Sequence, residues 1–95
     1  MKQFYVYILC DRPYGYLYTG VTSNLVQRIH QHKSKVMPGH TQQKNIGQLV
    51  YFEIHETAET AILAEKKIKK WKRQWKFNLI EHNNPHWNDL YAQLT

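Results

Sequence analysis

Two short runs of β-branched and aromatic residues at the start of the chain most strongly limit what it can fold into. Residues 4–10 (FYVYILC) and 17–21 (LYTGV) have the composition of strands, and Pro13 and Gly15 between them favour a turn. The pattern predicts an antiparallel hairpin, with successive side chains of each strand on opposite faces. Gly20 is unusual inside a strand, because glycine weakens a strand and often marks the close approach of another group.

The rest of the chain predicts helices around one further strand. The expected elements, in chain order, are a helix over 25–33, a loop over 34–47, a strand over 49–54, a long helix over 58–82 and a short helix over 87–94. The long helix is expected to bury Trp71 and Trp75 on its apolar side. The order β-β-α-β-α-α predicts an α/β (α+β) fold, in which helices flank a three-stranded, mainly antiparallel sheet. We expect residues 1–95 to form a single domain.

The charge balance favours a polyanionic partner. Thirteen Lys and Arg against seven Asp and Glu give a net charge of +6, although an ordinary basic protein explains this equally well. The single cysteine, Cys10, excludes an intramolecular disulfide, and no apolar run is long enough to span a bilayer. We therefore expect a soluble, cytoplasmic protein without membrane association.

Positive charge is concentrated in residues 66–76, which hold seven of the thirteen Lys and Arg residues. No acidic residue lies between Glu65 and Glu81, whereas a solvated helix face usually interleaves acids at a spacing of four. This density favours contact with a phosphate backbone over a merely solvent-facing surface. The expected contacts are Lys66, Lys69, Lys70, Lys72, Arg73 and Lys76.

Glu65 directly precedes this basic segment. On a helical wheel it lies beside Ala61 and Ile68, at the margin of the apolar side, where a carboxylate needs a partner. The ordinary interpretation is an ion pair with Lys69, four residues on. The functional interpretation is a ligand for Mg²⁺, because hard cations bind carboxylate oxygen and retain water for hydrolysis.

Two tyrosines and one helix face are further candidates. Tyr7 and Tyr18 lie on neighbouring strands of the hairpin, where a tyrosine is more often a packing residue than a catalytic one. Arg28 and His32 are four residues apart and share a helix face, and the planar guanidinium suits phosphate oxygens. A surface arginine beside a partly buried histidine explains the same pair. The spacing of histidines and the single cysteine do not predict a zinc site.

Taken in order along the chain, several motifs match one known family. They are Tyr5-Val6-Tyr7, Tyr18-Thr19-Gly20, residues 20–33, residues 38–41, residues 64–73 and residues 84–90. This set resembles the GIY-YIG nuclease superfamily, and in particular its small single-domain branch related to the N-terminal nuclease domain of the bacterial excision-repair subunit UvrC. Tyr5 replaces the glycine of the family name and Thr19 an isoleucine, while the tyrosines whose hydroxyls carry chemistry, Tyr7 and Tyr18, are present.

The resemblance implies a divalent-metal-dependent endonuclease that hydrolyses phosphodiester bonds. Glu65 would hold Mg²⁺ or Mn²⁺, and Tyr18 or Tyr7 would position or deprotonate the attacking water. Arg28 would stabilise the charge of the transition state.

The resemblance also assigns supporting residues. His32 and His40 would transfer protons, and the basic segment would hold the flanking backbone. The family's late asparagine matches either Asn78 or Asn84, and the sequence does not choose between them.

Two other functions compete with this one. The first is a non-catalytic nucleic-acid-binding module that uses the basic helix 66–76, and the second is an interaction protein that presents Trp71, Trp75 and Trp87. The expected partner is nucleic acid, with DNA favoured and a role in repair or recombination suggested by analogy alone. A protein partner or a homodimer stays open.

Overall fold

The computed structural model describes residues 2–34 and 46–94. The elements are β1 (Phe4–Cys10), β2 (Leu17–Thr22), α1 (Leu25–Lys33), β3 (Gln48–His55), α3 (Ala58–Lys69), α4 (Arg73–Asn83) and the 3-10 helix η1 (Leu90–Gln93). The expected order of strands and helices is confirmed, as is the three-stranded sheet flanked by helices. The strand boundaries lie within one residue of those expected from the sequence.

The sheet has the strand order β2-β1-β3, so β1 is its central strand. Both pairings are antiparallel, and Tyr7 of β1 lies opposite Gly20 of β2 and Phe52 of β3. A register shift between Ile8 and Leu9 interrupts the pairing of β1 with β3. Because β1 is paired on both edges, its side chains can be buried on both faces of the sheet.

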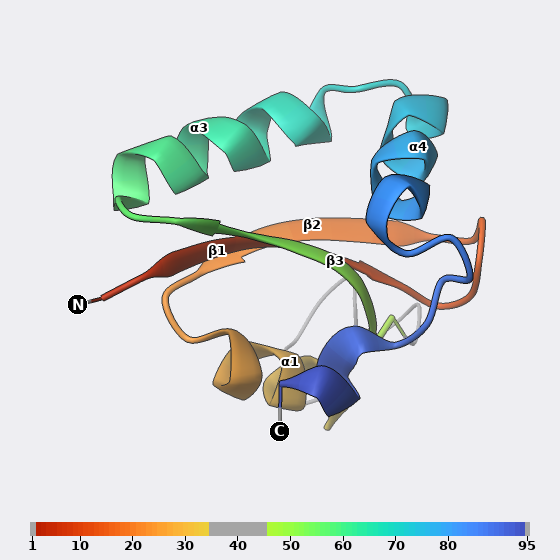
Figure 1. Cartoon of the computed structure of the whole chain (residues 1–95), viewed down its shortest axis with the longest axis horizontal. Helices are drawn as coiled ribbons and strands as arrows, with labels where there is room; N and C mark the ends of the chain where they lie inside the picture. Colours follow the sequence, from red (N-terminus) through yellow and green to blue (C-terminus); the bar gives the residue numbers. More distant parts are fainter. Residues whose placement is uncertain (1, 35–45, 95) are drawn as a thin grey trace.

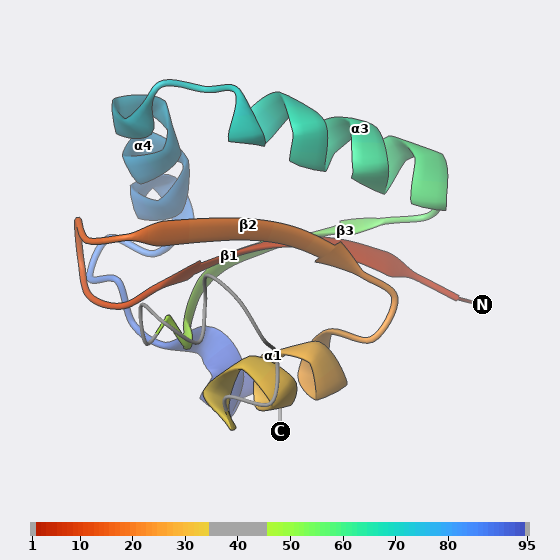
Figure 2. The ribbon, with the colours of Figure 1, turned by 180° about the vertical axis from the view of Figure 1, so that it is seen from behind.

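Helices cover both faces of the sheet, as Figures 1 and 2 show. On one face, beneath α3 and α4, Val6 and Ile8 belong to a buried cluster. On the other, Tyr7 and Leu9 pack with residues of α1, and the partly buried Leu90 of η1 joins them. The alternation predicted for the first strand is therefore confirmed.

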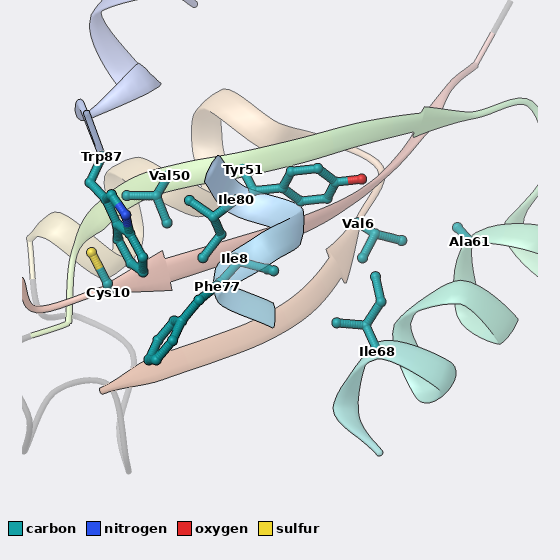
Figure 3. Close-up of a cluster of buried hydrophobic side chains, with 10 residues drawn as sticks. All are labelled: Val6, Ile8, Cys10, Val50, Tyr51, Ala61, Ile68, Phe77, Ile80 and Trp87. Atoms are coloured by element: carbon teal, nitrogen blue, oxygen red, sulfur yellow. The ribbon is translucent and has the colours of Figure 1, made fainter. Parts of the chain in front are cut away.

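The predicted single helix over 58–82 is wrong, because it ends at Lys69 and a second helix begins at Arg73. A straight helix of that length would extend for about 38 Å, whereas the eight residues of β3 span about 26 Å. The break lets Ile68 of α3 and Phe77 of α4 enter the same core, which Figure 3 shows. The basic segment 66–76 is consequently a corner between two helices.

The three tryptophans also differ from expectation. Trp71 is partly buried, but Trp75 is 52% exposed and does not lie on a buried face. Trp87 is 4% exposed and packs in the core beneath α4, so it cannot form part of a protein-binding surface. The predicted helix over 87–94 is reduced to the four residues of η1, and Trp87 itself has a positive φ of 55°.

Candidate active site

Gly20 makes room for the tyrosine at the centre of the sheet. Tyr7 is fully buried, and a Cβ atom at Gly20 would lie 2.5 Å from its Oη and 2.6 Å from its Cζ. Any larger residue at this position would displace the ring. The close approach that the sequence suggested at Gly20 is therefore the passage of the Tyr7 side chain over β2.

Tyr7, Tyr18 and His32 bring their rings together from three elements. The Tyr7 Oη lies 3.2 Å from His32 Nε2, within hydrogen-bonding distance. The His32 ring centroid is 5.9 Å from that of Tyr7 and 5.3 Å from that of Tyr18. We call this arrangement the tyrosine–histidine cluster.

Two local interactions place α1, and with it His32, against the sheet. Asn24 caps the helix, since its Oδ1 accepts a hydrogen bond from the Gln27 backbone N–H. At the other end of α1, Lys33 forms an ion pair with Asp89, whose carboxylate also accepts the Leu49 N–H of β3. Asp89 thereby ties the last turn of α1 to the sheet, directly after His32.

Arg28 contributes the positive charge of the cluster. Burial raises the pKa of Tyr7, and the nearby Tyr18 raises it further, while Arg28 opposes the shift by charge and hydrogen bonding. Burial also lowers the pKa of His32 from 6.5, and the charge of Arg28 lowers it further. Near neutral pH, Tyr7 therefore keeps its proton and His32 is mainly uncharged, which allows an imidazole nitrogen to accept a proton.

Glu65 lies on α3, the helix that covers the other face of the sheet from α1. Its carboxylate is 2.8 Å from the Lys69 ammonium, so the ion pair considered from the sequence is present. The Glu65 side chain is only 13% exposed. The structure thus gathers Tyr7, Tyr18 and Arg28 with His32, and places Glu65 in a different layer.

The donor set around Glu65 suits some metals and not others. Within residues 2–34 and 46–94, no three His, Cys, Asp or Glu side chains are grouped so that they could hold an ion. Zinc sites need three or four such ligands, whereas Mg²⁺ often binds one or two carboxylates and keeps water and phosphate oxygens. A lone carboxylate therefore fits Mg²⁺ or Mn²⁺.

The two candidate asparagines have different surroundings. Asn78 is exposed on α4, and its Oδ1 accepts a hydrogen bond from Gln74. Asn84 is buried, and its Nδ2 donates to the carbonyls of Val50 and Asn88. The Asn88 N–H in turn donates to the Asn84 Oδ1, so this side chain holds the C-terminal segment against β3. His40 lies outside the described residues.

The basic residues at the α3–α4 corner are of two kinds: some make side-chain contacts within the fold, and the others are exposed without such contacts among the described residues. Arg73 donates hydrogen bonds to the carbonyls of Tyr14 and Gly15, and so binds the β1–β2 turn to α4. Lys69 is paired with Glu65, and Lys76 Nζ lies 3.4 Å from the Lys69 carbonyl oxygen. The remaining candidates of this segment are exposed; they are Lys66, Lys70 and Lys72.

Sequence interpretation missed what Arg73, Asn84 and Asp89 do for the fold. The role of Arg73 depends on the β1–β2 turn reaching α4, where the Tyr14 ring also lies 5.2 Å from that of Phe77. Only this tertiary contact reveals the structural role of Arg73. For Asn84 and Asp89 a signal was available, since both fall in the matched segment 84–90.

Comparisons with known proteins identify the family of the chain. The GIY-YIG catalytic domain matches residues 3–78, and the chain therefore belongs to the GIY-YIG family, which is a family of nucleases. A UPF0213 protein of Staphylococcus saprophyticus is 35% identical over 80 residues, covering 84% of this chain and 96% of that protein. A UPF0213 protein of Clostridium perfringens is 41% identical over 76 residues, covering 80% of this chain and 81% of that protein.

A solved structure supports the same fold. The solution NMR structure of a UPF0213 protein from Bacillus halodurans matches with a TM-score of 0.57 and 28% identity, covering 92% of each chain. The described part of this chain contains no helix that is long and apolar enough to cross a membrane.

Proposed function

We propose that this chain is a GIY-YIG endonuclease that hydrolyses phosphodiester bonds of nucleic acid, with DNA as the favoured substrate. The observation that carries the proposal is the hydrogen-bonding contact between Tyr7 and His32, formed in the presence of Tyr18 and Arg28. A buried tyrosine hydroxyl against an uncharged imidazole is a path for a proton, which hydrolysis requires.

The proton path follows from the charges of the two side chains. Because the pKa of Tyr7 is raised, its phenolate is too scarce near pH 7 to act as a base on its own. Tyr7 is also fully buried, so the uncharged His32 would take the proton of the attacking water, while the Tyr7 hydroxyl would hold the imidazole in place through their 3.2 Å contact. Tyr18, whose ring centroid lies 6.3 Å from that of Tyr7 and 5.3 Å from that of His32, would orient the water.

Arg28 and Glu65 would act on the phosphate. No acidic side chain in the described ranges forms an ion pair with Arg28, so its charge can stabilise the pentacoordinate transition state. Glu65 would hold Mg²⁺ or Mn²⁺, and the ion would supply neutralising charge to a phosphate bound at β2, the edge strand that carries Tyr18 and against which α3 packs. His40 is proposed as a second proton carrier on the basis of the family motif.

Cleavage of labelled duplex, single-stranded and branched DNA, with Mg²⁺, with Mn²⁺ or with EDTA, tests the proposal. Tyr7→Phe and Arg28→Ala should each lower the rate by roughly 100-fold or more. Glu65→Gln should abolish metal-dependent cutting, whereas the matched control Glu59→Gln, an exposed acid of the same helix, should cut normally. A Glu65→Gln variant that cuts as fast as the wild type would exclude the proposed metal ligand.

The second candidate function is nucleic-acid binding without cleavage. It is favoured by Lys66, Lys70 and Lys72, which are exposed and have no acidic partner among the residues described. A wild-type protein that binds these DNAs but leaves them intact with either metal would establish this alternative.

A further inference from the structure

An open groove lies at the α3–α4 corner, away from the tyrosine–histidine cluster. It has a volume of about 430 Å³ and is lined by Trp71, Trp75, Asn78, Leu79 and His82. The break between α3 and α4 places Trp71 against the core and leaves Trp75 half exposed at the surface. An exposed tryptophan beside polar side chains is the kind of surface on which a flat ligand can stack.

The two indoles form a right-angled corner. Their ring centroids are 6.2 Å apart and their planes meet at 76°. Trp71 fixes the geometry because it packs against the core, and the Lys67 ammonium lies 5.9 Å from the centre of its ring. Trp75 therefore has one neighbour that holds it in position, while half of its surface remains available.

Exposed lysines belong to the same segment as the two tryptophans of this groove. Lys66, Lys70 and Lys72 flank the tryptophans in sequence and form no ion pair within the described residues. The Lys76 Nζ lies 3.4 Å from the Lys69 carbonyl oxygen, so cations are close together here; burial, and then the charges of Arg73 and Lys69, lower the pKa of Lys76. A polyanion relieves such crowding, whereas an apolar peptide does not.

We propose that the groove binds a single-stranded nucleic-acid segment, with an unpaired base stacked on Trp75 and its phosphates on the flanking lysines. Bases in a duplex are stacked inside the helix, so only an unpaired base can offer its face to Trp75. Asn78 and His82 line the same groove and can form hydrogen bonds with the edge of that base. The proposal rests on the proposed function only in taking nucleic acid as the ligand.

Its consequence for the endonuclease is a preference for substrates with an unpaired region. The groove and the tyrosine–histidine cluster lie on opposite faces of the sheet, since α4 covers one face and α1 the other. A nucleic-acid strand held in the groove would therefore lie outside the tyrosine–histidine cluster, where cleavage is proposed. Branched or frayed DNA and single-stranded loops supply such a strand, whereas a blunt, fully paired duplex does not.

Binding measured in EDTA tests the groove separately from cleavage. The probes are an oligothymidine strand, an abasic strand of equal length and a duplex. The oligothymidine strand is roughly 12 nucleotides long, which is within the usual range of site sizes for single-strand binding. Oligothymidine should quench the tryptophan fluorescence most strongly, and Trp75→Leu should remove most of that quenching. The same variant should weaken binding roughly tenfold, because a base stacked on an aromatic ring contributes this much to affinity. An oligouridine strand should behave similarly, since both carry unpaired bases.

Matched controls make the result decisive. Leu63→Ala changes an apolar residue of α3 that is 67% exposed and lies outside the groove, so it should leave binding and quenching unchanged. Trp75→Phe should retain part of the affinity, because phenylalanine also stacks. Equal binding of the abasic strand, or unchanged affinity in Trp75→Leu, would overturn the groove proposal even if cleavage persists. Concentration-dependent self-association that Trp75→Leu abolishes, without a change in DNA affinity, would instead assign the groove to a second copy of the chain.

Discussion

Replacing Gly20 with alanine should destabilise the fold through one contact. The added Cβ would lie 2.5 Å from the Tyr7 Oη and 2.6 Å from its Cζ, and Tyr7 is fully buried, so the ring cannot move freely away. Overpacking of this kind costs about 1–3 kcal/mol. Alanine also restricts the unfolded chain, which stabilises by about 0.4–1 kcal/mol. Taken at the middle of each range, the net loss should be about 1.3 kcal/mol.

Urea denaturation followed by circular dichroism measures this loss. The midpoint should fall while the dependence of the free energy of unfolding on urea keeps its slope, because the same surface is exposed on unfolding. In a thermal scan the midpoint should fall by about 4–8 °C for each kcal/mol lost. The displaced Tyr7 hydroxyl should also lose its contact with His32, so the rate of DNA cleavage should fall with the stability.

A double-mutant cycle with Tyr7→Leu can refute this reasoning. Leucine lacks the Cζ and Oη atoms that the new Cβ would meet, so Gly20→Ala should cost less than about 0.5 kcal/mol in that background. An equal cost in both backgrounds would mean that the β2 backbone, and not the tyrosine ring, requires glycine. Unchanged stability of the single Gly20→Ala variant would show that the core yields without strain.

Three further outcomes follow from buried groups. The pKa of His32 is lowered from 6.5 in the folded protein, so as pH falls below that value the unfolded chain binds a proton first and stability decreases. His32→Gln should remove this part of the slope when urea midpoints are compared between about pH 8 and about pH 5. Asn84→Ala should cost about 1–3 kcal/mol by calorimetry because the Val50 carbonyl loses its partner, whereas Asn78→Ala should cost less than about 0.5 kcal/mol. Burial raises the pKa of Cys10 to about 12, so a thiol reagent should label it only as urea unfolds the protein; rapid labelling of the native chain would contradict this.

Local sequence patterns were sufficient to predict the strands of the sheet. Residues 4–10 alternate between two faces as predicted, and both faces are buried because β1 is the central strand. Thr57 directly precedes α3 in the sequence and caps it, with its hydroxyl accepting the Thr60 N–H. These features depend on neighbours in sequence, which is why they can be predicted from it.

The long helix could not be predicted correctly from periodicity alone. Residues 58–82 keep an apolar spacing of three and four through Trp71 and Trp75, and no proline or glycine marks a break. The chain breaks at Lys70–Lys72 because two short helices bury more of the apolar surface on a short sheet than one long helix can. The limit is set by the size of the sheet, which is not a local property of the helix.

The candidate site, too, was predicted from the sequence only in part. Motif order along the chain identified the family, and the i, i+4 spacing of Arg28 and His32 predicted their shared helix face. The chemical roles of Tyr7, Tyr18 and Glu65 stay predictions that the cleavage experiments decide. What the structure adds is that α1 places His32 against the Tyr7 hydroxyl, while Glu65 lies on a helix that covers the opposite face.

By itself, the sequence determined the strands, the faces of β1 and the family, because each follows from residue types and spacings along the chain. Only the tertiary structure decided that Gly20 accommodates the Tyr7 ring, that the basic segment forms a corner and that Trp75 is exposed while Trp87 is buried. Each of these depends on which surfaces meet when three strands and their covering helices pack. That packing is a competition for buried area among segments far apart in the chain.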